Sequence, residues 1–263
     1  MSLDYLVLMS HVFFLIFARI AALIFSAPLF STEAVPAMAK VALSLLTAVL
    51  ILPGEAARGY VVPDTALMYV GFVVCEILIG LILGFLLQVY YAAFQLAGQF
   101  FALQMGFAAS QIFDPLSQVE LPLVGLLFNL MAMYVFLTGR GFHQLFFAGI
   151  QRSFETIRPY DFFLRRELLF DTLLRSIGEL FSQALLISLP ILGTLFLVSA
   201  SMGLLAKAAP QMNLLMISFP INIFIGFLLL FLMIPLLMES FGRIIDFSFT
   251  HLLRLMTPAG GGP

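Results

Sequence analysis

Apolar residues fill most of this chain in long runs, and a few charges and Pro/Gly pairs separate the runs. They predict about six apolar helical segments, interrupted by breaks, over residues 5–27, 36–52, 66–103, 121–138, 180–206 and 212–238. Several approach the roughly 20 residues that a helix needs to cross a bilayer. The third is too long for one perpendicular crossing, so we expect it to tilt, bend or extend beyond the bilayer.

The third segment continues into a charge-free stretch that differs from ordinary lipid-facing sequence. Ile77 to Phe113 carries no charged residue, yet polar residues stand among Phe, Met and Gly after Gly98, and the run ends at Asp114-Pro115. Irregular backbone at membrane depth is tolerated only where protein buries it or where it lines a water-filled path. We therefore predict a pore element here. Its closing residues would be Met105, Gly106, Phe107, Ile112 and Phe113, with Asp114 and Pro115 fixing the loop.

Composition places the chain in the membrane class. It has 263 residues, of which 62% are hydrophobic and 10% charged, whereas soluble domains carry roughly 25% charged residues. The net charge of −2 gives no sign of nucleic-acid binding. The single cysteine, Cys75, excludes an internal disulfide and a thiolate metal cage. We expect an all-α integral membrane protein, not an enzyme, without cofactor or metal site.

Loop charges suggest how the chain is oriented. If all six segments cross, most arginines lie on one side, which the positive-inside rule assigns to the cytoplasm. The polar stretch 139–179 belongs to that side, and its charges are spaced like helix-surface ion pairs: Arg152/Glu155, Glu155/Arg158, Asp171/Arg175 and Arg175/Glu179. This stretch is either an amphipathic cytoplasmic hairpin or a docking face for a partner, and the sequence leaves both interpretations open. Residues 1–257 would form one membrane domain, followed by a flexible tail, 258–263.

Two further clusters are candidates for helix packing and assembly. One is a row at four-residue spacing in the third segment, Glu76, Gly80, Gly84 and Gln88. Its glycines allow a second helix to approach closely. Glu76 could alternatively relay protons, or have Arg19 of the first segment as its partner. The other cluster is a tight turn between the last two segments, containing Lys207, Pro210, Gln211 and Asn213.

The motifs in their order resemble the FliR/SctT family of type III secretion export gates. They are Gln104-Met-Gly-Phe-Ala, Asp114-Pro115 and Lys207-Ala-Ala-Pro-Gln-Met-Asn213, preceded by Arg19, Pro28-Leu-Phe and Val35-Pro36 with Lys40. Gly141-Phe142-His143 is similar to the Gly-His-His pattern of the flagellar branch, with Phe142 in place of its first His. The resemblance covers about residues 5–250.

The resemblance implies an architecture and a function. The fold would be a set of tilted helical hairpins, like a fused FliP-like and FliQ-like unit, and the loop matching Gln104 to Val119 would be a plug. The chain would complete a FliP/FliQ/FliR assembly contacted by FlhB, in the bacterial inner membrane at the flagellar basal body and its ring. Unfolded exported flagellar proteins would pass through it. The alternatives are a small-molecule or ion secondary transporter that uses Glu76 and Arg19, and a purely structural scaffold.

Overall fold

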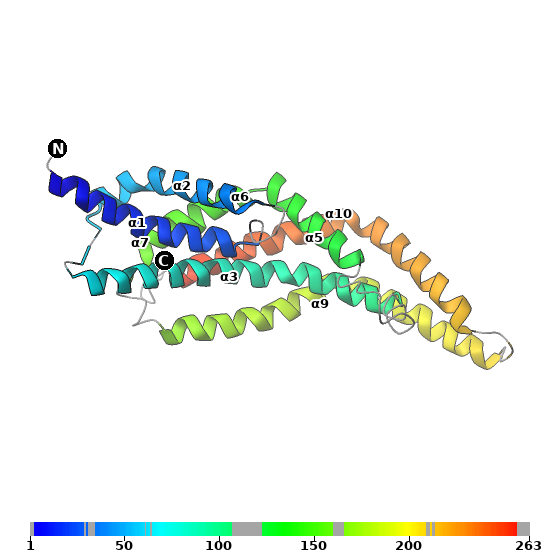
Figure 1. Ribbon diagram of the computed structural model, residues 1–263. Coiled ribbons are helices and arrows are strands. Elements are labelled where there is room, and N and C mark those ends of the chain that lie inside the picture. Colours follow the sequence, from blue (N-terminus) through cyan, green and yellow to red (C-terminus); the bar gives the residue numbers. More distant parts are fainter. Residues whose placement is uncertain are drawn as a thin grey trace. The chain divides into compact units, whose positions relative to one another are not determined.

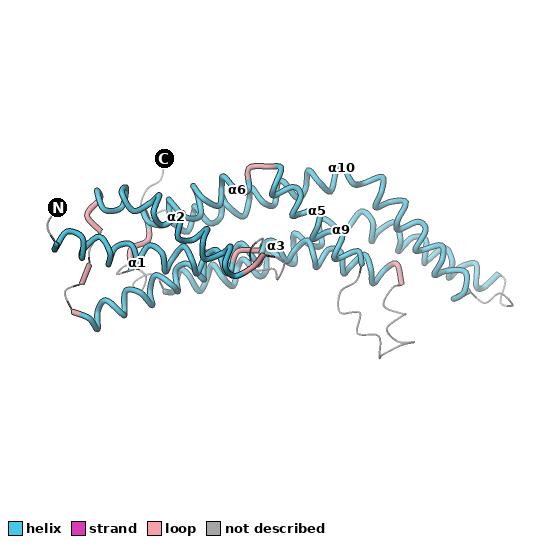
Figure 2. Tube along the Cα trace, turned by 45° about the horizontal axis from the view of Figure 1, so that its top comes forward, coloured by secondary structure: helices cyan, strands magenta, loops and turns pink. Residues whose placement is uncertain are grey.

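The computed structural model describes residues 3–28, 30, 35–60, 62–63, 65–106, 123–159, 166–208, 211 and 214–256 (Figure 1). In this part of the chain all regular secondary structure is helical (Figure 2). The elements are α1 (Leu3–Ser26), α2 (Ala37–Ala57), α3 (Ala66–Gln104), α5 (Leu123–Thr138), α6 (Gly141–Gln144), the π-helix η1 (Leu145–Gln151), α7 (Arg152–Thr156), α9 (Arg166–Ala208) and α10 (Leu214–Met256).

The long helices confirm the predicted all-α membrane class. Within the described residues, five are long and apolar enough to cross a membrane, in α1, α2, α3, α9 and α10. The number rises to six if the bent pair Val124–Thr138 and Gly141–Thr156 counts as one span. The sequence-predicted number of apolar segments therefore agrees with the upper count.

Three helices run further than their apolar segments predicted. Helix α2 continues through Pro53 to Ala57, and its end is closed by the backbone N–H groups of Arg58 and Gly59, which donate to Gly54 and Ala56. Gly59 has φ +72°, a left-handed conformation that suits glycine after a helix. Helix α9 begins at Arg166 instead of Leu180, and α10 ends at Met256 instead of Met238. Charged residues lower hydropathy, but they can continue a helix on its exposed face.

The chain forms two compact units, and each has its own core. The first comprises residues 1–89, 140–176 and 246–263. In it, α1 lies beside α2 (Figure 1) and contributes fully buried side chains three or four residues apart: Ile16, Ile20, Leu23 and Ile24. This spacing places them on one helix face.

Close backbone contact joins α1 to the first half of α3. A Cβ atom added to Gly80 would collide with the backbone oxygen of Arg19, and one added to Gly84 would collide with Ser26 Oγ. Both glycines therefore let the two helices approach more closely than larger residues would allow.

The second unit comprises residues 90–139 and 177–245 and has an aromatic core. The ring centroids of Phe94 and Phe241 are 4.4 Å apart, and those of Phe101 and Phe128 are 4.9 Å apart. Beside them α3 meets α5 closely, since a Cβ on Gly98 would lie 2.6 Å from the Cα of Gly125. The last turns of α3, which include the first residues of the predicted pore element, are thus packed into a core.

Candidate functional site

A buried ion pair joins α1 to α3 in the first unit. Arg19 is 1% exposed and Glu76 is 0% exposed, and Arg19 Nε donates to Glu76 Oε2. A buried charge is costly unless it is paired and its remaining polar atoms are satisfied. The sequence offered Arg19 as one possible partner of Glu76, and the structure contains this pair.

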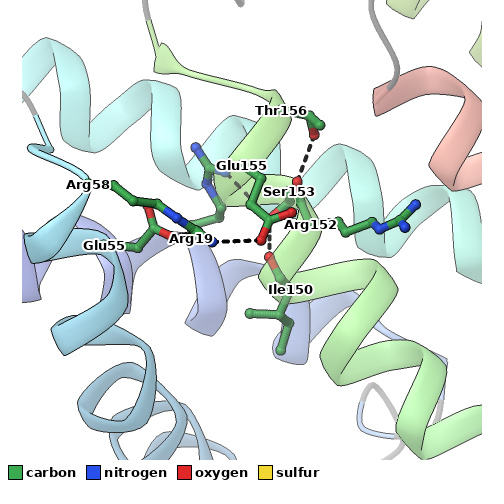
Figure 3. A network of polar contacts seen from close by, with 8 residues as sticks. All are labelled: Arg19, Glu55, Arg58, Ile150, Arg152, Ser153, Glu155 and Thr156. Atoms are coloured by element: carbon green, nitrogen blue, oxygen red, sulfur yellow. Dashed lines mark hydrogen bonds and ion pairs between the residues drawn. The ribbon is translucent and has the colours of Figure 1, made fainter.

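The other two guanidinium nitrogens of Arg19 have partners in and just after α7, of which Figure 3 shows Ser153. Its Nη2 donates to the backbone oxygen of Ile157 at 2.9 Å, and its Nη1 approaches Ser153 Oγ at 3.4 Å. The carbon of the guanidinium group lies 4.2 Å from the centroid of the Phe154 ring, within range of a cation–π interaction. Arg19 thus connects three segments that are distant in sequence.

Tyr60, between α2 and α3, supplies the second partner of Glu76. Its hydroxyl donates to Glu76 Oε1. Burial, together with the negative charge of Glu76, raises the pKa of Tyr60 above its ordinary value. The phenol therefore stays protonated at neutral pH and acts as a hydrogen-bond donor.

Arg58 forms a more exposed part of the same network (Figure 3). It donates to Glu55 at 2.6 Å and to Glu155 at 2.9 Å. Hydrogen bonds to these carboxylates raise the pKa of Arg58, whose side chain is 49% exposed. The network as a whole links α1, the end of α2, α3 and α7.

The charge spacing within 139–179 predicted ion pairs, of which the structure contains Asp171–Arg175, whereas Glu155 has a different partner. Asp171 and Arg175 do pair, at 2.9 Å. Glu155, however, binds Arg58 from a different part of the chain. Helix α7 ends at Thr156 and Ile157 is extended, so Glu155 and Arg158 are not three residues apart on one helix. Within the described ranges, no group of three or more His, Cys, Asp or Glu side chains could hold a metal ion.

The predicted pore element begins as a helix, not as irregular backbone. Residues 98–104 continue α3, and the break comes at Met105 and Gly106. Their N–H groups donate to Phe101 and Leu103, at 2.9 and 3.1 Å. Gly106 has φ +89°, which a side chain would strain, and Met105 is 1% exposed. The other predicted loop residues, Phe107, Ile112, Phe113, Asp114 and Pro115, lie outside the described residues.

The residues predicted for packing and assembly are placed as follows. Glu76, Gly80 and Gly84 face α1 of the same chain. Gln88, further along α3, lines a small apolar cavity of about 350 Å³ with Ser26 and Phe85. Lys207 is exposed in the last turn of α9, and Gln211 is exposed in the turn that follows. Pro210 and Asn213 lie outside the described residues.

Sequence reasoning did not identify several residues that complete these sites. Tyr60 and Ser153 are single polar residues with no periodic partner. Gly226 and Phe219 of α10 contact the end of α3, although they stand in an apolar helix as ordinary members of it. No local pattern distinguishes such residues from their neighbours.

Long apolar helices joined by a buried ion-pair network define an all-α integral membrane protein. Residues 10–248 match the family "Bacterial export proteins, family 1", and this chain belongs to that family. It is 32% identical over 257 residues to the flagellar biosynthetic protein FliR of Borreliella burgdorferi, covering 97% of this chain and 94% of the relative.

Two other relatives carry the same name. FliR of Pectobacterium carotovorum is 32% identical over 225 residues, covering 86% of this chain and 85% of the relative. FliR of Escherichia coli K12 is 30% identical over 219 residues, covering 83% and 82%. The family resemblance based on the sequence motifs is thereby confirmed.

Proposed function

We propose that this chain is a subunit of the flagellar type III protein export gate, in the bacterial inner membrane at the basal body. Membership of a bacterial export family, similarity to proteins named FliR and the long apolar helices support this proposal. The chain would complete a helical assembly with FliP and FliQ, contacted by FlhB. Unfolded flagellar proteins would be its cargo.

The proposed mechanism is passive closure of the lumen by an apolar loop. The observation that supports it best is the end of α3, where buried Met105 and left-handed Gly106 stop the helix. The sequence that follows contains Phe107, Ile112 and Phe113, before Asp114-Pro115. Apolar constrictions close pores by excluding water. The loop would yield to an export substrate without any catalytic step in this chain.

The remaining predicted residues would serve assembly. Gly80 and Gly84 are used within this chain, where they bring α3 against α1. Lys207 and Gln211 are exposed at the α9–α10 turn, so this turn, with Pro210 and Asn213, is the part we propose for contacts with neighbouring subunits.

A transporter role for Glu76 receives less support from the geometry. Both of its carboxylate oxygens accept hydrogen bonds, from Arg19 and from Tyr60, and the side chain is fully buried. A substrate would have to displace a partner of the ion pair in order to bind there. We therefore propose a structural role for Glu76.

Deleting residues 106–113 tests the gate. In cells that express the whole assembly, we expect the deletion to make the membrane leaky to ions while the assembly still forms. A matched control keeps the loop length and its apolar character, with Leu at positions 107, 112 and 113, and should stay tight. A correctly assembled deletion variant with unchanged impermeability would contradict the proposal.

A further inference from the structure

Helix α10 contacts the end of α3 through Gly226, a position at which α10 has no side chain. A Cβ atom added to Gly226 would lie 2.6 Å from Met105 Cγ, 2.7 Å from its Cε and 2.9 Å from its Sδ. Met105 therefore fills the space that a side chain at position 226 would need. Met105 is 1% exposed, so its surroundings, which include Gly226, bury it almost completely.

A second α10 residue covers the next position of the chain. A Cβ added to Gly106 would lie 2.5 Å from Phe219 Cδ1 and 2.8 Å from its Cε1. Phe219 and Gly226 are two helical turns apart, so they lie on the same face of α10. Together they contact the two residues that follow the last residue of α3, Met105 and Gly106.

We infer that Phe219 and Gly226 are positioning residues for the proposed gate, because they set where and in which direction the chain leaves α3. This inference rests on the proposed function. Met105 would then act as an anchor inside the protein and not as a lining residue of the lumen. Because Gly106 adopts a left-handed conformation against the Phe219 ring, the backbone direction at the start of the loop depends on this contact.

Gly226→Ala disturbs the anchor selectively. The atoms that its new methyl group would meet belong to the flexible Met105 side chain and not to backbone, so the strain is relieved by moving Met105. Gly242→Ala is a matched control on α10, since its methyl group would meet only Val135 Cγ1, at an ordinary 3.8 Å.

Phe219→Ala acts by the opposite route, because it removes the ring that covers Gly106 and adds no bulk. It keeps the inference testable if Gly226→Ala fails to accumulate. Its matched control is Phe224→Ala, which truncates a phenylalanine of the same helix that is 69% exposed.

The experiment measures the position of the loop with a thiol probe. In the full chain co-expressed with its partner subunits, Cys75 is replaced by Ala and Ser110 by Cys, so that the probe is the only thiol of this chain. Spheroplasts are treated with a membrane-impermeant maleimide. We expect Gly226→Ala and Phe219→Ala to raise the labelling rate roughly tenfold over the parent, equivalent to about 1.4 kcal/mol. The two controls should label at the parental rate.

The outcomes separate this inference from the proposed function. If the 106–113 deletion leaks ions but both α10 variants label like their controls, the positioning role is overturned and the gate stands. If the deletion does not make the membrane leaky, the proposed gate function is contradicted. Faster labelling in the two variants would still support the role of Phe219 and Gly226 in positioning the residues after α3. Equal acceleration by Gly242→Ala or Phe224→Ala would overturn the inference, because the effect would not be specific to the end of α3.

Discussion

At the scale of single residues, the Arg19–Glu76 pair explains how charge is accommodated between apolar helices. All three guanidinium nitrogens of Arg19 are used, by Glu76, Ser153 and the Ile157 backbone. Both oxygens of Glu76 are used as well. Removing either charge would leave the other buried without compensation, whereas removing both would not.

Glu76→Gln should therefore destabilise the protein by about 3–5 kcal/mol, the usual cost of breaking a buried pair from one side. The measurement is the midpoint of heat-induced loss of the monodisperse peak in size-exclusion chromatography, for the complex purified with co-expressed FliP and FliQ. The double variant Arg19→Met/Glu76→Leu is the control, and we expect it to recover most of the loss. A Glu76→Gln midpoint equal to that of the parent would contradict the structural role of the pair.

Tyr60 gives the same network a pH dependence. Its pKa is raised above the ordinary 10.0 because it is buried beside Glu76. A raised pKa in the folded state means that the contribution of Tyr60 to stability is complete below pH about 10 and is lost as pH rises above it. We expect the unfolding midpoint to fall as pH rises above about 10, the ordinary tyrosine pKa, and to fall less in Tyr60→Phe. An equal fall in both proteins would assign the effect to other groups.

At the scale of elements, glycines decide how closely helices pack. Gly80 and Gly84 bring α3 against the backbone of α1, and Gly98 brings it against Gly125 of α5. These contacts lie in different units, so one long helix uses the same device twice. Apolar character alone would not select these partners, since lipid tails are as apolar as leucine.

Gly80→Ala tests the first of these contacts. The new Cβ would collide with the backbone oxygen of Arg19, which cannot move aside as a side chain can, so we expect a loss of about 1–3 kcal/mol. Gly71→Ala is the matched control on the same helix, because nothing lies within 4 Å of a Cβ there. Thermal unfolding should place this control at or slightly above the parent, since alanine favours a helix more than glycine does. Equal midpoints for the two variants would refute the close contact.

At the scale of the whole molecule, the helices differ in how much of their surface the chain itself covers. In the apolar stretch of α3, 44% of the residues are buried, but in the apolar stretches of α9 and α10 only 22% are buried. Large apolar residues of α9 are exposed, among them Leu186, Leu189, Phe196 and Leu197. Such faces require lipid or neighbouring subunits, and the proposed assembly would provide the latter.

We therefore expect the chain to be unstable in mild detergent when it is expressed alone, and to be recovered in a stable complex with co-expressed FliP and FliQ, because binding stabilises the folded state. Size-exclusion chromatography of the purified material gives the answer. Recovery of a stable, monodisperse lone monomer would count against the export-gate proposal.

The sequence was sufficient for the class of this protein and its family, and its six apolar segments agree with the upper count of candidate spans in the described residues. Hydropathy, helix length and ordered motifs are local properties, so they can be recognised without knowing the fold. The sequence also shows Arg19 and Glu76 inside apolar segments, where a charged side chain is energetically costly. Their presence there indicated a specific role for both residues.

Only the tertiary structure decided which residues meet. Glu155 binds Arg58, 97 residues away, instead of its helix neighbours. Pro53 lies inside α2, and charged residues continue α9 and α10 beyond their apolar segments. Met105 is held against Gly226 by the packing of α3 on α10. Such contacts depend on how helices cross in space, and a lone glycine or serine has no sequence pattern that reveals its distant partner.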